Sequence, residues 1–242
     1  MKSPSILSLL LVLSGLAVGK TRYYVYITSK MSWIDAQSFC RSTYTDLAAI
    51  ATAEENLKVM NNVQFYQSSI WIGMNRSSSG SWHWCDGEPT SIFSWKVGEP
   101  NNYLQNENCV CVNVYGWNDY TCSSLLSFMC HWNIILVKQK KTWEEALQYC
   151  KENYIGLACV SSLTKTIMAD SEIAQADTVS VWSGLRFMNA KWFWLTGERV
   201  QSAYALPSCP AQNYRCGARN HITHTWENRD CNEELNFICY QK

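Results

Sequence analysis

Apolar residues recur along the chain first at strand-like and then at helix-like intervals, and this order occurs twice. The aromatic and β-branched run Tyr23–Ile27 predicts a strand. It is followed by apolar residues at helical spacing, which are Trp33, Ala36, Phe39 and Cys40. These residues predict a helix from about Ser32. In the second half, Ile134–Val137 predicts a strand and the pattern from Thr142 predicts a helix.

Polar residues mark two of the helix starts, and further strands follow. Thr142 and Glu145 form a capping box, and Thr52 and Glu55 form another, which opens a second helix in the first half. Three more strands are predicted there, at Trp82–Trp84, Val110–Val114 and Ser127–Cys130. The stretch Asp86–Asn108 has little periodicity. A loop of that length within a small domain is usually functional.

The two halves of the chain are repeats of one another. At an offset of about 110 residues they share tryptophans and cysteines. The aligned pairs include Trp33 with Trp143, Cys40 with Cys150, Trp71 with Trp182, Cys109 with Cys216, Cys122 with Cys231, and Cys130 with Cys239. We therefore expect two domains, residues 22–131 and 132–242. Their junction near residues 131–133 has no Pro, Gly or Ser spacer, so the domains should lie close together.

Composition and the first residues indicate an exported globular protein. The 20 basic and 20 acidic residues balance, which argues against nucleic acid as a partner. Residues 1–19 combine Lys2, an apolar run and small residues up to Gly19, as in a secretory signal peptide. An uncleaved membrane anchor is the alternative, but the run is short for a span of ~20 residues. No later segment is apolar enough to span a membrane, so we expect a secreted, extracellular protein.

The cysteines also indicate an oxidising compartment. There are 12 of them, none within the signal, which predicts disulfides. Zinc is the alternative, but no paired CxxC motif is present and Cys109-Val110-Cys111 is too tight for a usual zinc site. The first-helix cysteine and the last cysteine of each half can pair, as Cys40–Cys130 and Cys150–Cys239. Each bridge would close a long loop, worth about 4–5 kcal/mol as an upper estimate, although sequence alone does not fix connectivity.

Three motifs in the first half carry oxygen ligands. Glu99-Pro100-Asn101 lies in the long loop, Glu107 precedes Cys109, and Trp117-Asn118-Asp119 precedes Cys122. Here the chain resembles the C-type lectin family, over essentially its whole length after the signal. The resemblance implies an α+β fold of two tandem disulfide-stapled domains, each with two helices, antiparallel sheets and a long loop region. In this family the proline of the first motif is cis.

The resemblance also implies one calcium site, in the first domain. Calcium takes 6–8 oxygen ligands, and three carboxylates and two amides supply them, from Glu99, Asn101, Glu107, Asn118 and Asp119. Without thiol or imidazole, zinc is disfavoured. In the family the same five residues bind sugar hydroxyls, and the E-P-N order favours mannose, N-acetylglucosamine and fucose. The alternative is that calcium only orders the loop. Tyr103 and Leu104 are either contacts for a second sugar or a partly exposed loop pair.

Other features of the two halves follow from the same resemblance. It implies the bridges Cys109–Cys122 and Cys216–Cys231. Cys85 and Cys111 are extra to the family's four-cysteine pattern. Cys85 follows one predicted strand and Cys111 lies in another, and these strands pair in this fold, so we expect a Cys85–Cys111 bridge. Cys159–Cys209 is the extra pair in the second half, and both assignments rest partly on elimination. No second calcium site is evident. Asn75-Arg76-Ser77 is a sequon, so we predict N-glycosylation of Asn75.

The second half departs from the sugar-binding pattern. Its corresponding loop, residues 205–213, has no E-P-N motif, and Trp226 is followed by Glu227 and Asn228. We expect no calcium-dependent sugar binding there, and either protein binding or a purely structural role. His221 and His224 form an HxxH pair, but no third metal ligand is evident, so a polar loop is the simpler interpretation.

The function predicted for the whole is a secreted lectin for mannose-type glycans, in innate recognition of microbial surfaces or in cell adhesion. A single shallow site binds sugar at the millimolar scale, about −4 kcal/mol, so an oligomer or clustered ligand is implied. The alternative is a protein-binding or ice-binding protein of the same fold without physiological sugar binding. Neither HExxH nor G-x-S-x-G occurs, and we expect no enzymatic activity.

Overall fold

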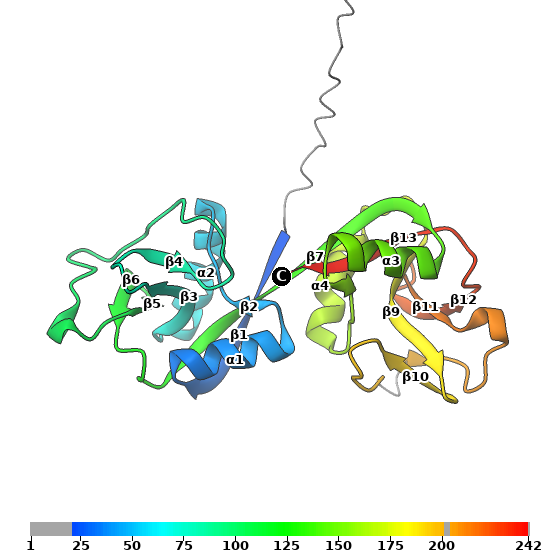
Figure 1. Cartoon of the computed structure of the whole chain (residues 1–242), viewed down its shortest axis with the longest axis horizontal. Coiled ribbons are helices and arrows are strands. Elements are labelled where there is room, and N and C mark those ends of the chain that lie inside the picture. Colours follow the sequence, from blue (N-terminus) through cyan, green and yellow to red (C-terminus); the bar gives the residue numbers. More distant parts are fainter. Residues whose placement is uncertain (1–20, 201–203, 242) are drawn as a thin grey trace, which may run out of the picture.

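The computed structural model describes residues 21–200 and 204–241, and the expected signal peptide lies outside them. Two domains lie side by side, each with two helices packed against mostly antiparallel strands (Figure 1). The first domain contains β1 (Thr21–Met31), α1 (Trp33–Thr43), β2 (Asp46–Leu47), α2 (Ala53–Tyr66), β3 (Ile70–Arg76), β4 (Trp82–Trp84), the 3-10 turn η1 (Tyr103–Gln105), β5 (Cys109–Asn113) and β6 (Gly116–Tyr120).

The second domain repeats this order of elements. It contains α3 (Trp143–Asn153), β8 (Gly156–Leu157), α4 (Leu163–Ile173), β9 (Ser180–Met188), β10 (Lys191–Trp194), the 3-10 turn η3 (Gln212–Tyr214), β11 (Cys216–Asn220), β12 (Thr225–Arg229) and β13 (Leu235–Gln241). The predicted α+β architecture of two tandem domains is therefore confirmed.

One strand, β7 (Leu126–Lys141), runs through both domains. Its first part pairs with β1, with Tyr24 opposite His131, and its second part pairs with β13, with Tyr240 opposite Ile134. The sequence predicts two strands separated by a short junction. The junction instead continues the strand, because Asn133 has a β1 partner on one side and a β13 partner on the other. The two sheets are thus one, as Figure 1 shows for the green ribbon between the domains.

Side chains cross the boundary between the domains as well. Tyr23 and Tyr44 of the first domain pack against a core cluster of the second. The Tyr23 hydroxyl donates to Glu172 Oε2 at 3.2 Å. The Lys165 ammonium lies 5.7 Å from the Tyr44 ring centroid and 5.8 Å from that of Trp132, so a cation from α4 joins two aromatic rings.

The helix starts form as their sequence predicts. Thr52 accepts from the backbone N–H of Glu55 and the Glu55 side chain accepts in return, which completes the capping box of α2. Thr142 and Glu145 do the same for α3. Ser32 caps α1. These caps satisfy backbone donors that the first helical turn leaves unpaired.

Four of the six predicted disulfides are present. They are Cys40–Cys130, Cys109–Cys122, Cys150–Cys239 and Cys216–Cys231. The predicted Cys85–Cys111 and Cys159–Cys209 bridges are wrong for this structure, since all four cysteines are free. The strands near Cys85 and Cys111 do not pair with each other, because both β4 and β5 pair with β3. Two strand spacings of ~4.8 Å each therefore separate Cys85 from Cys111. This separation exceeds the ~7 Å between Cα atoms that a disulfide can bridge.

The second wrong bridge has a different cause. Cys159 is buried, with its thiol directed at the Leu157 carbonyl oxygen 3.7 Å away, whereas Cys209 is exposed. The Cys85 thiol lies equally near the Leu47 carbonyl oxygen. Leu47 and Leu157 are equivalent in the repeat. The two thiols therefore fill the same space in the two domains, although they come from positions that do not align.

Candidate functional site

The site lies where β6 meets the long loop of the first domain. β6 pairs with β5, with Asp119 opposite Val110. The Trp117 ring is buried in the core, and its Nε1 donates to Asn56 Oδ1 on α2 at 2.9 Å. This hydrogen bond fixes β6 at Trp117, directly before Asn118 and Asp119.

The Asp119 carboxylate holds the loop against β6. Oδ1 accepts from the Asn101 backbone N–H at 3.1 Å, and Oδ2 accepts from the Asn102 backbone N–H at 2.8 Å. Asp119 itself is 0% exposed. The Glu99–Pro100 peptide bond just before these donors is cis, as the family resemblance implied.

The remaining predicted ligands belong to the same network. Glu107 Oε2 and Asn101 Oδ1 both accept from the Tyr103 backbone N–H, each at 2.8 Å. Asn118 Nδ2 donates to the Asp119 carbonyl oxygen at 2.7 Å. The structure thus brings all five predicted residues to one place, with Glu99 joined to the others electrostatically.

The pKa of Glu99 reflects its burial and the negative charge of the neighbouring carboxyl groups. Its Oε2 is buried and has no hydrogen-bond donor among the described residues. Burial raises the pKa of Glu99 above its ordinary value, and the nearby carboxyls of Asp119 and Glu107 raise it further, against the opposing charge of Lys96. The Glu99 carboxylate is therefore repelled by those of Asp119 and Glu107, and a bound cation would relieve this repulsion.

The chemical types of the five predicted ligands suit calcium. The ligand atoms are carboxylate and amide oxygens, which calcium prefers. Within residues 21–200 and 204–241, however, no group of three or more His, Cys, Asp or Glu side chains is placed to hold a metal ion. Asp119 directs its oxygens at backbone donors.

Asn102 braces the site and was not predicted from the sequence. Besides its contact with Asp119, its Oδ1 accepts from the Glu107 backbone N–H at 3.1 Å. Asn102 has φ 47°, in the left-handed region that asparagine tolerates better than most residues. A second asparagine directly after the E-P-N motif was the available signal. The loop then leaves Leu104 79% exposed and Tyr103 exposed beside it.

The second domain carries different residues at these positions. Tyr214 stands where the first domain has Glu107, and Asn228 where it has Asp119. Asn228 donates to the Tyr214 carbonyl oxygen at 3.3 Å. Glu227, at the position of Asn118, accepts from Ser180 and Asn220, each at 2.8 Å. Its carboxylate is thus held by protein donors.

The HxxH pair is also accounted for by local contacts. His224 Nδ1 lies 3.3 Å from Asp170 Oδ2. The same carboxylate binds the Arg219 guanidinium through two hydrogen bonds of 2.8 Å. A polar surface loop, the simpler interpretation, describes this arrangement.

Similarity to known proteins identifies the family of this chain. The family model of the lectin C-type domain matches twice, at residues 29–132 and 139–241. The chain belongs to the C-type lectin domain family and contains two such domains in tandem.

Individual relatives match over different parts of the chain. C-type mannose receptor 2 of Rattus norvegicus is 24% identical over 90% of this chain and 17% of its own length. A C-type lectin of Thrasops jacksonii, one of the lectoxins, is 35% identical over 44% of this chain and 74% of its own. The chain thus spans about a sixth of the mannose receptor. These relatives are lectins and receptors by name.

Solved structures match one domain at a time. Human lithostathine covers 48% of this chain at 23% identity and a TM-score of 0.43, over 98% of its own length. The carbohydrate-recognition domain of mouse scavenger receptor C-type lectin covers 46% at 28% identity and a TM-score of 0.44, over 90% of its own length. No helix in the described part of this chain is both long and apolar enough to span a membrane.

Proposed function

We propose that the first domain is a calcium-dependent lectin site for mannose-type glycans, including N-acetylglucosamine and fucose. One observation carries the proposal. The E-P-N loop, Glu107 and the W-N-D strand form a single hydrogen-bonded unit around Asp119. The unit gathers oxygen ligands and leaves the buried Oε2 of Glu99 without a donor among the described residues.

The roles of the residues follow from their chemistry. A calcium ion held by Glu99, Asn101, Glu107, Asn118 and Asp119 would supply coordination positions for two vicinal sugar hydroxyls. The Glu99 and Glu107 carboxylates can accept from those hydroxyls, and the Asn101 and Asn118 amides can donate to them. The order of acceptor and donor in Glu99-Pro100-Asn101 supports preference for equatorial 3- and 4-hydroxyls, in line with the family resemblance.

The loop beyond the ligands offers apolar surface. Tyr103 and Leu104 are both largely exposed and follow the E-P-N motif closely. We assign them contact with a second sugar of an extended glycan, because an aromatic ring and an aliphatic chain suit the apolar face of a pyranose.

The whole chain is proposed to be secreted and to act in innate recognition or adhesion. Export is supported by the predicted signal and by four disulfides, which persist in oxidising compartments. One weak site implies clustering of sites, either by oligomerisation or on a particle that presents many glycans. We assign the second domain a structural role, which is supported by the shared β7 and by Lys165 between Tyr44 and Trp132.

Retention on mannan-agarose tests the proposal. Wild-type protein should bind with calcium present, elute with free mannose, and fail to bind after chelation. Glu99→Ala should abolish retention, and Glu234→Ala, which removes an exposed acid of the second domain, should not. Mannan retention that is unaffected by both the chelator and Glu99→Ala would decide against a calcium-dependent lectin site, and absence of retention with calcium present would favour a protein-binding or ice-binding role of this fold.

A further inference from the structure

The first domain has an open depression beside α1. Its volume is about 440 Å³, and its lining is mainly apolar. It is lined by Trp33 and Ile34 of α1, by Asn75 and Arg76 of β3, and by residues around the Cys109–Cys122 disulfide. Ile34 is 60% exposed. Exposed apolar surface of this kind calls for an explanation.

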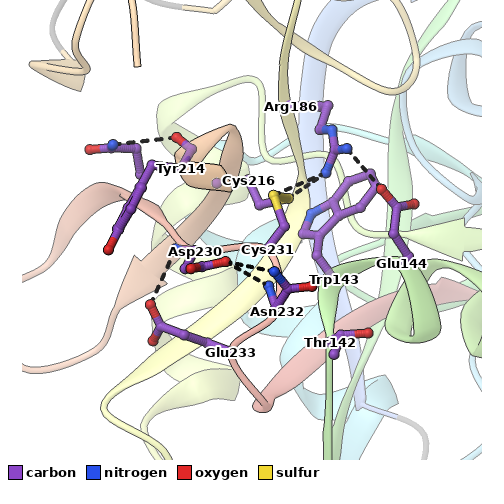
Figure 2. Close-up of a disulfide and its surroundings, with 12 residues drawn as sticks. Thr142, Trp143, Glu144, Arg186, Tyr214, Cys216, Asp230, Cys231, Asn232 and Glu233 are labelled. Atoms are coloured by element: carbon purple, nitrogen blue, oxygen red, sulfur yellow. Dashed lines mark hydrogen bonds and ion pairs between the residues drawn. A yellow bond between two sulfur atoms is a disulfide. The ribbon is translucent and has the colours of Figure 1, made fainter. Parts of the chain in front are cut away.

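The second domain fills the equivalent place with its own arginine. Figure 2 shows Arg186 between Trp143, Glu144 and the Cys216–Cys231 disulfide. The guanidinium carbon lies 4.4 Å from the Trp143 ring centroid, and Arg186 Nη2 lies 2.8 Å from Glu144 Oε1. Arg186 Nη1 also contacts the sulfur atoms of Cys216 and Cys231. The guanidinium therefore covers the tryptophan and the disulfide together.

The repeat aligns these residues one by one. Asn75 of β3 corresponds to Arg186 of β9, since each lies two residues after the glycine of its W-x-G motif. Trp33 corresponds to Trp143, and Ile34 to Glu144. The first domain thus keeps the tryptophan and the disulfide. It replaces the covering arginine and its carboxylate partner with a short amide and an isoleucine, and so leaves the depression open.

Asn75 lines this depression. Its side chain is half-buried, and Oδ1 is buried without a hydrogen-bond partner among the described residues. The neighbouring Arg76 does not cover the site, because its Nε donates to the Gly80 carbonyl oxygen at 3.1 Å and its guanidinium lies over Trp82. Ser77 supplies the hydroxyl that completes the sequon.

We propose that Asn75 carries an N-linked glycan whose first N-acetylglucosamine covers Trp33, Ile34 and the Cys109–Cys122 disulfide, in the place that Arg186 takes in the second domain. The donor is a lipid-diphosphate-linked oligosaccharide of the export pathway. Asn75 Nδ2 forms the bond to C1 of the first sugar, the C1–oxygen bond to the diphosphate breaks, and Nδ2 loses one proton. The proposal rests on the proposed export of the chain and not on its sugar binding.

Occupancy is measured on full-length protein recovered from the medium of eukaryotic cells that make high-mannose glycans. Mass spectrometry should find a glycan on the Asn75 peptide that peptide N-glycosidase removes. The glycan should be absent from Ser77→Ala, which keeps Asn75 itself. An unmodified Asn75 in secreted wild-type protein would overturn the proposal. Mannan retention of the same preparation reports separately on the calcium site.

The covering role is tested by trimming. An endoglycosidase that leaves only the first N-acetylglucosamine should leave the melting temperature unchanged, whereas peptide N-glycosidase, which removes that sugar as well, should lower it by about 2–4 °C. Ser77→Ala is not used for this comparison, because the Ser77 hydroxyl accepts from the Ser81 backbone N–H. The double variant Asn75→Arg with Ile34→Glu transplants the second domain's residues and should restore the melting temperature without any glycan. Equal melting temperatures after the two enzyme treatments would contradict the contact between the first sugar and the depression.

Discussion

Asp119 on β6 accepts a hydrogen bond from the backbone N–H of Asn101, with 3.1 Å between Oδ1 and the nitrogen. This bond joins two motifs that lie 18 residues apart. The second Asp119 oxygen accepts from the next residue of the loop. The Asp119 carboxylate, which is proposed to bind calcium, therefore also holds in place the loop segment that carries Glu99 and Asn101.

Replacing Asp119 should disturb both roles. In Asp119→Asn, one oxygen acceptor becomes an amide donor that faces a backbone N–H, which should cost about 1–3 kcal/mol of loop stability. Calcium affinity should fall at least ~10–100-fold, because the loss of a residue that only hydrogen-bonds a metal ligand already has an effect of this size. Calorimetric titration with calcium measures this. Asn228→Ala at the equivalent second-domain position is the control and should leave calcium affinity unchanged.

Acid should weaken calcium binding. Because the pKa of Glu99 is raised, the calcium-free folded state binds more protons than the unfolded state over the window just above the ordinary glutamate pKa. Its stability therefore falls as pH rises through that window. Calcium requires the ionised carboxylates, so its affinity should decrease from about pH 7.5 to about pH 5. Titrations at several pH values test this, and affinity that is constant or rises in acid would refute it.

A variant isolates the contribution of Glu99. Glu99→Gln has no proton to exchange at this position, so its calcium-free stability should no longer fall with rising pH in the same window. Chemical denaturation in chelator, at matched pH values, provides the comparison with wild type.

The ligand residues were predictable because each motif combines residue types that bind calcium. The bracing role of Asn102 was not, because it depends on a backbone conformation, φ 47°, and on contacts with Asp119 and Glu107. Sequence spacing does not report such contacts. The raised pKa of Glu99 likewise depends on burial, which follows only from the folded loop.

The free thiols should differ sharply in reactivity. Cys209 is exposed, whereas Cys111 and Cys159 are buried. Burial raises the pKa of Cys111 to about 12 and also raises those of Cys85 and Cys159, which disfavours the reactive thiolate. Ellman's reagent should therefore titrate one thiol rapidly in native protein and four in denaturant.

The matched variant for this experiment is Cys209→Ser, which should remove the rapid reaction and leave three thiols in denaturant. Two thiols in denatured wild-type protein would show that one pair of these cysteines is bridged, and none would show that both pairs are; either result would contradict the structure.

The two domains should unfold together. Lys165 is 6% exposed, and its ammonium contacts the Tyr44 and Trp132 rings and lies 3.8 Å from Glu198. Lys165→Ala removes these contacts from the boundary and should cost about 1–3 kcal/mol. Scanning calorimetry should show one transition that moves to lower temperature, while the exposed Lys140→Ala leaves it in place. Two separate transitions, of which only one responds, would show independent domains.

Local signals predicted most of the fold. The capping pairs Thr52 with Glu55 and Thr142 with Glu145 marked helices that the structure contains. The continuity of β7 escaped prediction, because residues 131–133 pair with strands far away in sequence. The Cys85–Cys111 prediction failed for the same reason, since the position of β3 between β4 and β5 is a property of the sheet.

Calorimetric titration of methyl α-mannoside into calcium-loaded protein tests the central claim most directly. We predict saturable heat with a dissociation constant on the order of 1 mM, about −4 kcal/mol, that disappears in chelator and in Glu99→Ala. Absence of saturable heat in calcium-loaded wild-type protein, or heat that persists in chelator, would contradict the account.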